Sequence, residues 1–468
     1  MPKKYHIDTQ ETPPRFYPVG KYTTIEFRED CAGSCRECVK KKCVYGIFED
    51  NFLHNSTMKE PEYLYACMSC FRCVQECTKG IFSRVINPEY RTLGNNYWTS
   101  DIIHRTWYQA HTGSIPVSGS GYRGPFAGKG FDSMWTDMSE IVRPTRDGIH
   151  GREYINTCIE LSRRPARLSF TEDMKLAIDV PPILEMPLPI LFRQPDFGIL
   201  SREVLLSMVK AAAIINTLML INPKEIKEDL KPFLKNLIPQ LTKDNYVDYS
   251  DLIIGCQMVS LAYQPKIEQE FAKLREINPN IFIMVNIPLD KDCKSIVENL
   301  VKTDVDTLYC YTDENGLELN TDNPRFVKDM TREIHLAMVN LSARQRVNLI
   351  IYGGIAMAEH VNKEIICGAD GIAIDLPLLV AMECRLCGRC LEGLSCPVKL
   401  EEMDVDYGCA RIINLIGAWR NQMLEMLGAM GLREIRRLRG EVGRSMWFED
   451  LEKENFGPIF GERKVAAI

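Results

Sequence analysis

Apolar segments of strand length alternate with amphipathic helical segments between about residue 183 and residue 375 of this 468-residue chain. The apolar segments are hydrophobic throughout rather than at every second residue, which is typical of strands buried on both faces of a parallel sheet. We expect strands at 187–192, 217–221, 249–255, 281–287, 307–311, 347–354 and 369–375, and helices at 201–213, 224–241, 265–276, 291–302 and 323–341. This alternation predicts an α/β fold, and the number of strands favours a closed (β/α)8 TIM-type barrel over an open sheet.

Eighteen cysteines set the second constraint, because twelve of them fall in three tight groups. A large chain whose first residues lack the apolar stretch of a signal peptide is a poor candidate for a disulfide-stabilised secreted domain. Metal ligation by thiolates is therefore the better explanation for the groups. We expect the six other cysteines to pack in the core as small apolar side chains. They are Cys158, Cys256, Cys293, Cys310, Cys367 and Cys409.

The two amino-terminal groups have the cysteine spacing of iron–sulfur proteins. The second group follows the C-x2-C-x2-C-x3-C order of bacterial ferredoxins and consists of Cys67, Cys70, Cys73 and Cys77. The first group has one more residue in its first and last gaps and consists of Cys31, Cys35, Cys38 and Cys43. The repeat predicts a ferredoxin-like domain at residues 1–90 with two [4Fe–4S] clusters, in which the last cysteine of each group binds the other group's cluster. Zinc is the alternative, but zinc ribbons do not use successive three-residue steps.

The third group of cysteines follows directly after the last predicted strand. It consists of Cys384, Cys387, Cys390 and Cys396. The cysteine groups and the predicted strands together divide the chain into four parts. These are the ferredoxin-like domain at 1–90, a wrapping connector rich in glycine and aromatic residues at 91–160, the barrel at 161–383, and an iron–sulfur loop with a helical extension at 384–468.

Glycines near the last two predicted strands indicate an anion site in the barrel. Gly353 and Gly354 end one strand, and Gly368 and Gly371 flank the start of the next. Barrels of this kind hold a phosphate group with backbone amides after the seventh and eighth strands. The glycines therefore predict bound FMN, with a simple glycine turn as the alternative.

Three sequence segments together resemble the FMN-binding central region of the glutamate synthase large subunit, in its archaeal-type form with an amino-terminal ferredoxin module. They are MSEIVRPTRDGIHGREYI at 138–155, the glycine and cysteine segments at 353–397, and GAWRNQMLEMLGAMGLREIRRLRGEVGRSMWFEDLE at 417–452. The resemblance implies that the third cysteine group holds a cluster beside the flavin. Cys384, Cys390 and Cys396 match the three ligands of that family's [3Fe–4S] cluster, and the additional Cys387 would allow a [4Fe–4S] cluster instead.

Two residues depart from the pattern of that family. Asn286 stands where the family has a lysine near the flavin, and we keep it as a candidate flavin contact. Asp375 stands where the family's phosphate loop offers a backbone amide, and a carboxylate beside a phosphate is unfavourable unless it points away.

Three functions remain open on the sequence. The resemblance favours an iron–sulfur oxidoreductase subunit that contains FMN and exchanges electrons with other redox subunits or a ferredoxin-like carrier. The alternatives are a working glutamate synthase and a flavin-free relay scaffold. A formal net charge of −6, with scattered basic residues, does not suit nucleic-acid binding. Without an apolar segment long enough to span a membrane, we expect a cytoplasmic protein.

Overall fold

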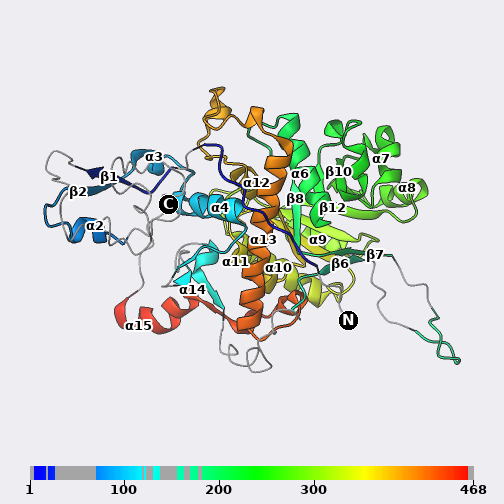
Figure 1. Cartoon of the computed structure of the whole chain (residues 1–468). Coiled ribbons are helices and arrows are strands. Elements are labelled where there is room, and N and C mark those ends of the chain that lie inside the picture. Colours follow the sequence, from blue (N-terminus) through cyan, green and yellow to red (C-terminus); the bar gives the residue numbers. More distant parts are fainter. Residues whose placement is uncertain are drawn as a thin grey trace.

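Eight parallel strands form a closed barrel in the computed structural model, which describes residues 5–16, 19–26, 70–118, 121–122, 130–136, 155–162, 169–177 and 182–461. The strands follow chain order, and pairing of the last strand with the first closes the ring. They are β8 (Ile190–Arg193), β9 (Met219–Ile221), β10 (Leu237–Leu241), β11 (Met258–Ala262), β12 (Phe282–Pro288), β13 (Thr307–Tyr311), β14 (Asn348–Tyr352) and β15 (Gly371–Ile374). The predicted barrel is therefore confirmed (Figure 1).

Helices cover the outside of the barrel, one after each strand except β9, which two 3-10 turns follow. They are α6 (Arg202–Ile215), α7 (Ser250–Gly255), α8 (Gln269–Ile277), α9 (Cys293–Leu300), α10 (Val327–Asn340), α11 (Ala358–Cys367) and α12 (Leu376–Ala381). After α12, a loop leads to the 25-residue helix α13 (Val405–Ala429), which packs on α6, α11 and α12. Among the described residues, no helix is both long and apolar enough to cross a membrane.

Two predicted elements are wrong. The segment 224–241 is not one helix, because its second half contains the short 3-10 turn 231–236 and then strand β10. Pro232 and Pro239 lie in this segment, and proline cannot occupy the interior of a continuous helix without breaking it. The segment 249–255 is not a strand but contains helix α7, in which Leu252 is buried while Ile254 is exposed. Strand β11 follows this helix. A short apolar run alone does not distinguish a strand from a helix.

The amino-terminal part of the chain contributes small elements beside the barrel. Strand β1 (Tyr22–Glu26) pairs antiparallel with β2 (Phe82–Ile86), so that the two ends of the cysteine-containing segment come together. Helices α2 (Arg72–Gln75), α3 (Pro88–Arg91) and α4 (Ser100–Thr112) follow from this region toward the barrel. In Figure 1, α4, α12 and α13 lie between the β1–β2 sheet and the barrel strands.

Three further two-stranded antiparallel sheets and two short helices complete the described strands and α-helices. The sheets pair β3 (Val117–Ser118) with β4 (Gly121–Tyr122), β5 (Met134–Thr136) with β16 (Ser445–Trp447), and β6 (Ile159–Ser162) with β7 (Ile183–Met186). The helices are α14 (Phe448–Leu451) and α15 (Gly457–Phe460).

A buried carboxyl group on α11 should make stability depend on pH. Burial raises the pKa of Glu364 from 4.5 to about 7. The unfolded chain releases this proton near pH 4.5 and the folded chain only near pH 7, so the resulting loss of stability grows between these values and is complete above them. At about 1.4 kcal/mol per pH unit, we expect Glu364→Gln to raise the free energy of unfolding by about 2–3 kcal/mol at pH 8.

Urea unfolding followed by tryptophan fluorescence at pH 5 and pH 8 checks this expectation. At pH 5 the gain should fall below about 1 kcal/mol, because this pH lies only about half a unit above the ordinary pKa of 4.5 and little of the penalty has developed. An equal gain at the two pH values would show that the ionisation of Glu364 is not its cause.

Candidate functional site

A buried ion pair lies at the carboxyl end of the barrel strands. Arg193, the last residue of β8, donates from Nη1 to Oδ2 of Asp375, which directly follows β15, at 2.6 Å. The hydroxyl of Tyr352, the last residue of β14, donates to the same oxygen at 2.6 Å. The backbone N–H of Leu376 donates to Oδ1 at 2.6 Å. Burial raises the pKa of the Asp375 carboxyl, and the positive charge of Arg193 opposes this effect. Four elements of the chain therefore meet at one carboxylate.

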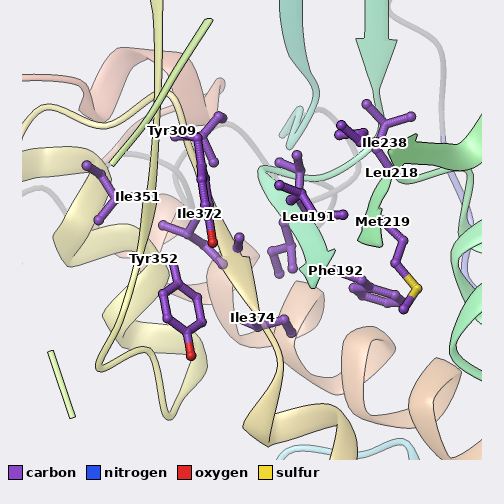
Figure 2. Packing of buried hydrophobic residues seen from close by; sticks show 14 of the residues in the cluster. Leu191, Phe192, Leu218, Met219, Ile238, Tyr309, Ile351, Tyr352, Ile372 and Ile374 are labelled. Carbon is purple, nitrogen blue, oxygen red and sulfur yellow. The ribbon is translucent and has the colours of Figure 1, made fainter. Parts of the chain in front are cut away.

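Tyrosine side chains surround this ion pair. Tyr309 and Tyr311 of β13 stack with ring centroids 6.0 Å apart, and the ring of Tyr309 lies 6.5 Å from that of Tyr352. The guanidinium carbon of Arg193 lies 4.4 Å from the centroid of the Tyr352 ring. Figure 2 shows Tyr309 and Tyr352 with the apolar side chains of Ile372 and Ile374. Aromatic rings from β13 and β14 therefore line this part of the carboxyl end of the barrel.

The predicted flavin contact Asn286 lies on β12, in register with Tyr309 of the neighbouring strand. Its side-chain oxygen accepts a hydrogen bond from the hydroxyl of Ser260 on β11. The structure thus places Asn286 on the barrel wall with a protein partner already bound to its amide oxygen.

The predicted glycine turn follows β14 and packs tightly against the loop after β13. Gly353 and Gly354 have φ values of 123° and 68°, which favour glycine. A Cβ atom on Gly353 would lie 1.7 Å from Oγ1 of Thr312, so a side chain has no room there. The N–H of Gly354 donates to the carbonyl of Glu314 at 3.4 Å, and the N–H of Ala356 donates to Nδ1 of His360 at 3.2 Å. Protein groups therefore already use these amides.

The polar groups around Asp375 do not fit the phosphate of FMN. A phosphate site needs free donors, whereas Arg193, Tyr352 and the N–H of Leu376 all donate to Asp375. Arg193 also forms an ion pair with Asp196, so one positive charge already faces two carboxylates. A further anion would meet net negative charge there.

The other two predicted cofactor glycines lie at the opposite end of the barrel. Gly368 follows α11 and precedes β15, and a Cβ atom on it would lie 2.3 Å from Cβ of His335. Gly371 begins β15, where a Cβ atom would lie 3.1 Å from the carbonyl oxygen of Pro189. Both glycines permit close packing between elements, and the structure does not bring them to Gly353 and Gly354.

The third cysteine group lies on the loop between α12 and α13. Cys384, Cys390 and Cys396 are partly exposed and Cys387 is exposed. These four cysteines are free thiols. Within the described ranges, no three side chains of His, Cys, Asp or Glu are gathered closely enough to hold a metal ion. The charges of the other three thiols nevertheless act on Cys384, since burial raises its pKa to about 12 and these charges add to the rise.

The backbone of this loop is curled. Glu383, Leu386 and Lys399 have φ values of 76°, 46° and 44°, in the left-handed region, as have two of the loop's glycines. The N–H of Leu386 donates to Sγ of Cys384 at 3.4 Å. Such N–H groups directed at sulfur tune iron–sulfur clusters in proteins. Four thiols on one loop are the donor type of an iron–sulfur cluster, although in this structure the described side chains are not gathered around one metal position.

Segments from the amino-terminal part hold both sides of the cysteine loop. The buried carboxylate of Glu383 accepts hydrogen bonds from the backbone N–H and Nε of Arg15 at 2.7 and 2.9 Å. Arg15 also donates from Nη2 to the carbonyl of Val398 at 3.0 Å. On the other side, the N–H of Gly94 donates to the carbonyl of Arg385 at 3.2 Å, and Leu386 packs in the cluster that contains Leu93 and Trp107. Sequence reasoning missed these contacts, because a single arginine or glutamate gives no signal of its distant partner.

Only part of the predicted amino-terminal cluster domain can be compared with the structure. Cys31, Cys35, Cys38, Cys43 and Cys67 lie outside the described residues. Cys73 lies on α2, and the side chains of Cys73 and Cys77 pack against Ile81 and Phe82. The two-cluster domain therefore stays a prediction.

Comparisons with known proteins find a family match over part of the chain and distant relatives over most of it. The family described as "Conserved region in glutamate synthase" matches residues 251–433. The archaeal glutamate synthase [NADPH] of Archaeoglobus fulgidus is 24% identical over 92% of this chain and 96% of its own length. The archaeal-type enzyme of Thermotoga maritima is 23% identical over 90% and 94% of the two chains. Among solved structures, mandelate oxidase covers 65% of this chain and 97% of its own, with 12% identity and a TM-score of 0.39. The chain therefore carries the conserved region of glutamate synthase and is a distant homologue of the archaeal-type glutamate synthases over most of its length.

Proposed function

We propose that the chain is an iron–sulfur electron-transfer subunit of the glutamate synthase family. The curled loop of Cys384, Cys387, Cys390 and Cys396, with its N–H···S contact at Cys384, is the observation that carries this proposal. Four thiolates on one loop suit a [4Fe–4S] cluster, and a [3Fe–4S] cluster would need only three of them. Such a cluster, when bound, accepts and donates single electrons.

The surroundings of the loop suit an exchange of electrons with the amino-terminal clusters. The segments that hold the loop, around Arg15 and around Gly94, lie in sequence just before and just after the cysteine-containing part of the ferredoxin-like domain. Arg385 and Arg389 lie between the thiols in sequence and would compensate the negative charge of a reduced cluster. A chain with three clusters would pass electrons between a ferredoxin-like carrier or partner subunit and the barrel.

Iron analysis of the protein purified without oxygen tests the proposal. We expect about 12 irons and as many acid-labile sulfides per chain, the content of three [4Fe–4S] clusters. Electron paramagnetic resonance after reduction should then show interacting clusters, and a signal in the oxidised protein would identify a [3Fe–4S] cluster. About eight irons, with none lost when the third cysteine group is mutated, would contradict the proposal for the carboxyl-terminal loop.

A working glutamate synthase is the second candidate, favoured by the homology over 92% of the chain. The paired groups at Asp375 do not fit an FMN phosphate, so no step through a flavin is part of our proposal. An assay of ammonia-dependent glutamate formation from 2-oxoglutarate with reduced ferredoxin distinguishes the two. Glutamate formation would favour the second candidate, whereas iron–sulfur clusters without glutamate would favour the first.

A further inference from the structure

We infer that the carboxylate of Asp375 replaces the phosphate of FMN in this barrel, so that the barrel is complete without a flavin. The inference goes beyond the proposed electron transfer, which depends on the cysteine loop and not on the carboxyl end of the barrel. It rests on the donors that Asp375 engages, on the local charge and on the packing of the glycine turn.

The donors around Asp375 are those that would otherwise hold an oxyanion. A guanidinium N–H, a phenol O–H and a backbone N–H converge on its two oxygens, each at 2.6 Å. Guanidinium and backbone N–H groups are the common partners of phosphate in proteins. The side chain is buried, with 5% of its surface exposed, so these contacts are not shared with solvent. Asp375 thus binds the three donors that would otherwise bind an oxyanion such as phosphate.

The local charge is unfavourable for a second anion. Arg193 supplies one positive charge and faces the carboxylates of Asp375 and Asp196. The phosphate of FMN carries between one and two negative charges near neutral pH. Bringing it to a carboxylate that is already buried would add repulsion, and Arg193 already faces two carboxylates.

The glycine turn after β14, which would contribute backbone amides to a phosphate site, is also packed against other protein groups. The loop after β13 packs on the glycine turn so closely that the Cα of Gly316 lies 3.0 Å from the Cβ position of Gly354. The hydroxyl of Tyr97 donates to the carbonyl of Gly354, and the indole N–H of Trp98 donates to the carbonyl of Glu314 at 2.9 Å. The connector segment therefore fastens the loop over the turn.

Flavin content and titration test the inference on the wild-type protein. Acid treatment of protein purified without oxygen should release no stoichiometric flavin, and added FMN should keep its full fluorescence in the presence of the protein. Stoichiometric flavin, or quenching that saturates at one FMN per chain, would overturn the inference. Neither result changes the iron content, so the inference and the proposed function can fail separately.

A variant gives a second test with inorganic phosphate as the probe. In Asp375→Ala, the donors of Arg193, Tyr352 and Leu376 lose their carboxylate, and phosphate can take its place. We expect near-saturating phosphate to raise the thermal midpoint of Asp375→Ala by about 3 °C or more, and to leave the wild type unchanged.

Asp196→Ala is the matched control for this variant. It removes the other carboxylate paired with Arg193, but that carboxylate is 80% exposed. Asp196→Ala should therefore respond to phosphate as little as the wild type does. If Asp375→Ala folds and is as indifferent to phosphate as Asp196→Ala, Asp375 does not occupy an oxyanion position. If it does not fold, the flavin titration of the wild type decides alone.

Discussion

Replacing Cys384 with serine should remove one cluster, about four irons per chain, and leave the amino-terminal clusters in place. Cys384 lies on the loop after α12, and its Sγ accepts the N–H of Leu386. The predicted ligands of the other clusters belong to a separate part of the sequence, before residue 78. Because the ligand sets do not overlap, the loss should be confined to one cluster. Iron and sulfide analysis together with electron paramagnetic resonance measures the change.

Cys409→Ser is the control for this experiment. Cys409 is a buried free thiol on α13, close in sequence to the loop but outside the three groups. Its replacement should leave all irons in place, with only the small cost of a core substitution. If Cys384→Ser instead abolished the ferredoxin-type signals as well, the division of the clusters between two parts of the chain would be wrong.

The barrel could be predicted from the sequence because most of its strands are short, uniformly apolar and separated by helices. The prediction for β13 matches its bounds, and β12, β14 and β15 fall within their predicted segments or differ by a residue. Strand β10 was missed because LIPQL contains a proline and a glutamine. Proline is rare inside a strand, and a polar residue interrupts the apolar run that marks the others.

The candidate site could be predicted only where its signal is local. The cysteine spacing marks a loop beyond the last strand, and the structure places this loop after the short helix α12 that follows β15. Asp375 was noticeable only as a departure from a pattern, and its partner Arg193 lies 182 residues earlier. Likewise, Glu383 and Arg15 are 368 residues apart. Pairs of this kind arise when the barrel closes, and no property of the single residues reveals them.

A fully buried arginine on α13 gives the second large expected effect. Arg411 donates from Nε to the carbonyl of Ala381 at 2.6 Å, from Nη1 to that of Thr12 at 2.9 Å, and from Nη2 to that of Trp107 at 3.5 Å. Its side chain thereby joins α12, α4 and the amino-terminal segment at one point. Arg411→Met keeps much of the volume but leaves carbonyl groups without their donor, and each such buried group costs about 1–3 kcal/mol.

We therefore expect Arg411→Met to lower the free energy of unfolding by about 3–5 kcal/mol in urea titrations. Arg420→Met on the same helix is the control, because the Nε of Arg420 makes no hydrogen bond among the described residues. This replacement should lower the free energy of unfolding by about 1 kcal/mol. Since Ala381 ends the helix that leads into the cysteine loop, Arg411→Met should also lose the iron of that loop before the other irons as urea is raised. Loss of all irons at one urea concentration would show that Arg411 supports the whole fold and has no particular effect on the loop.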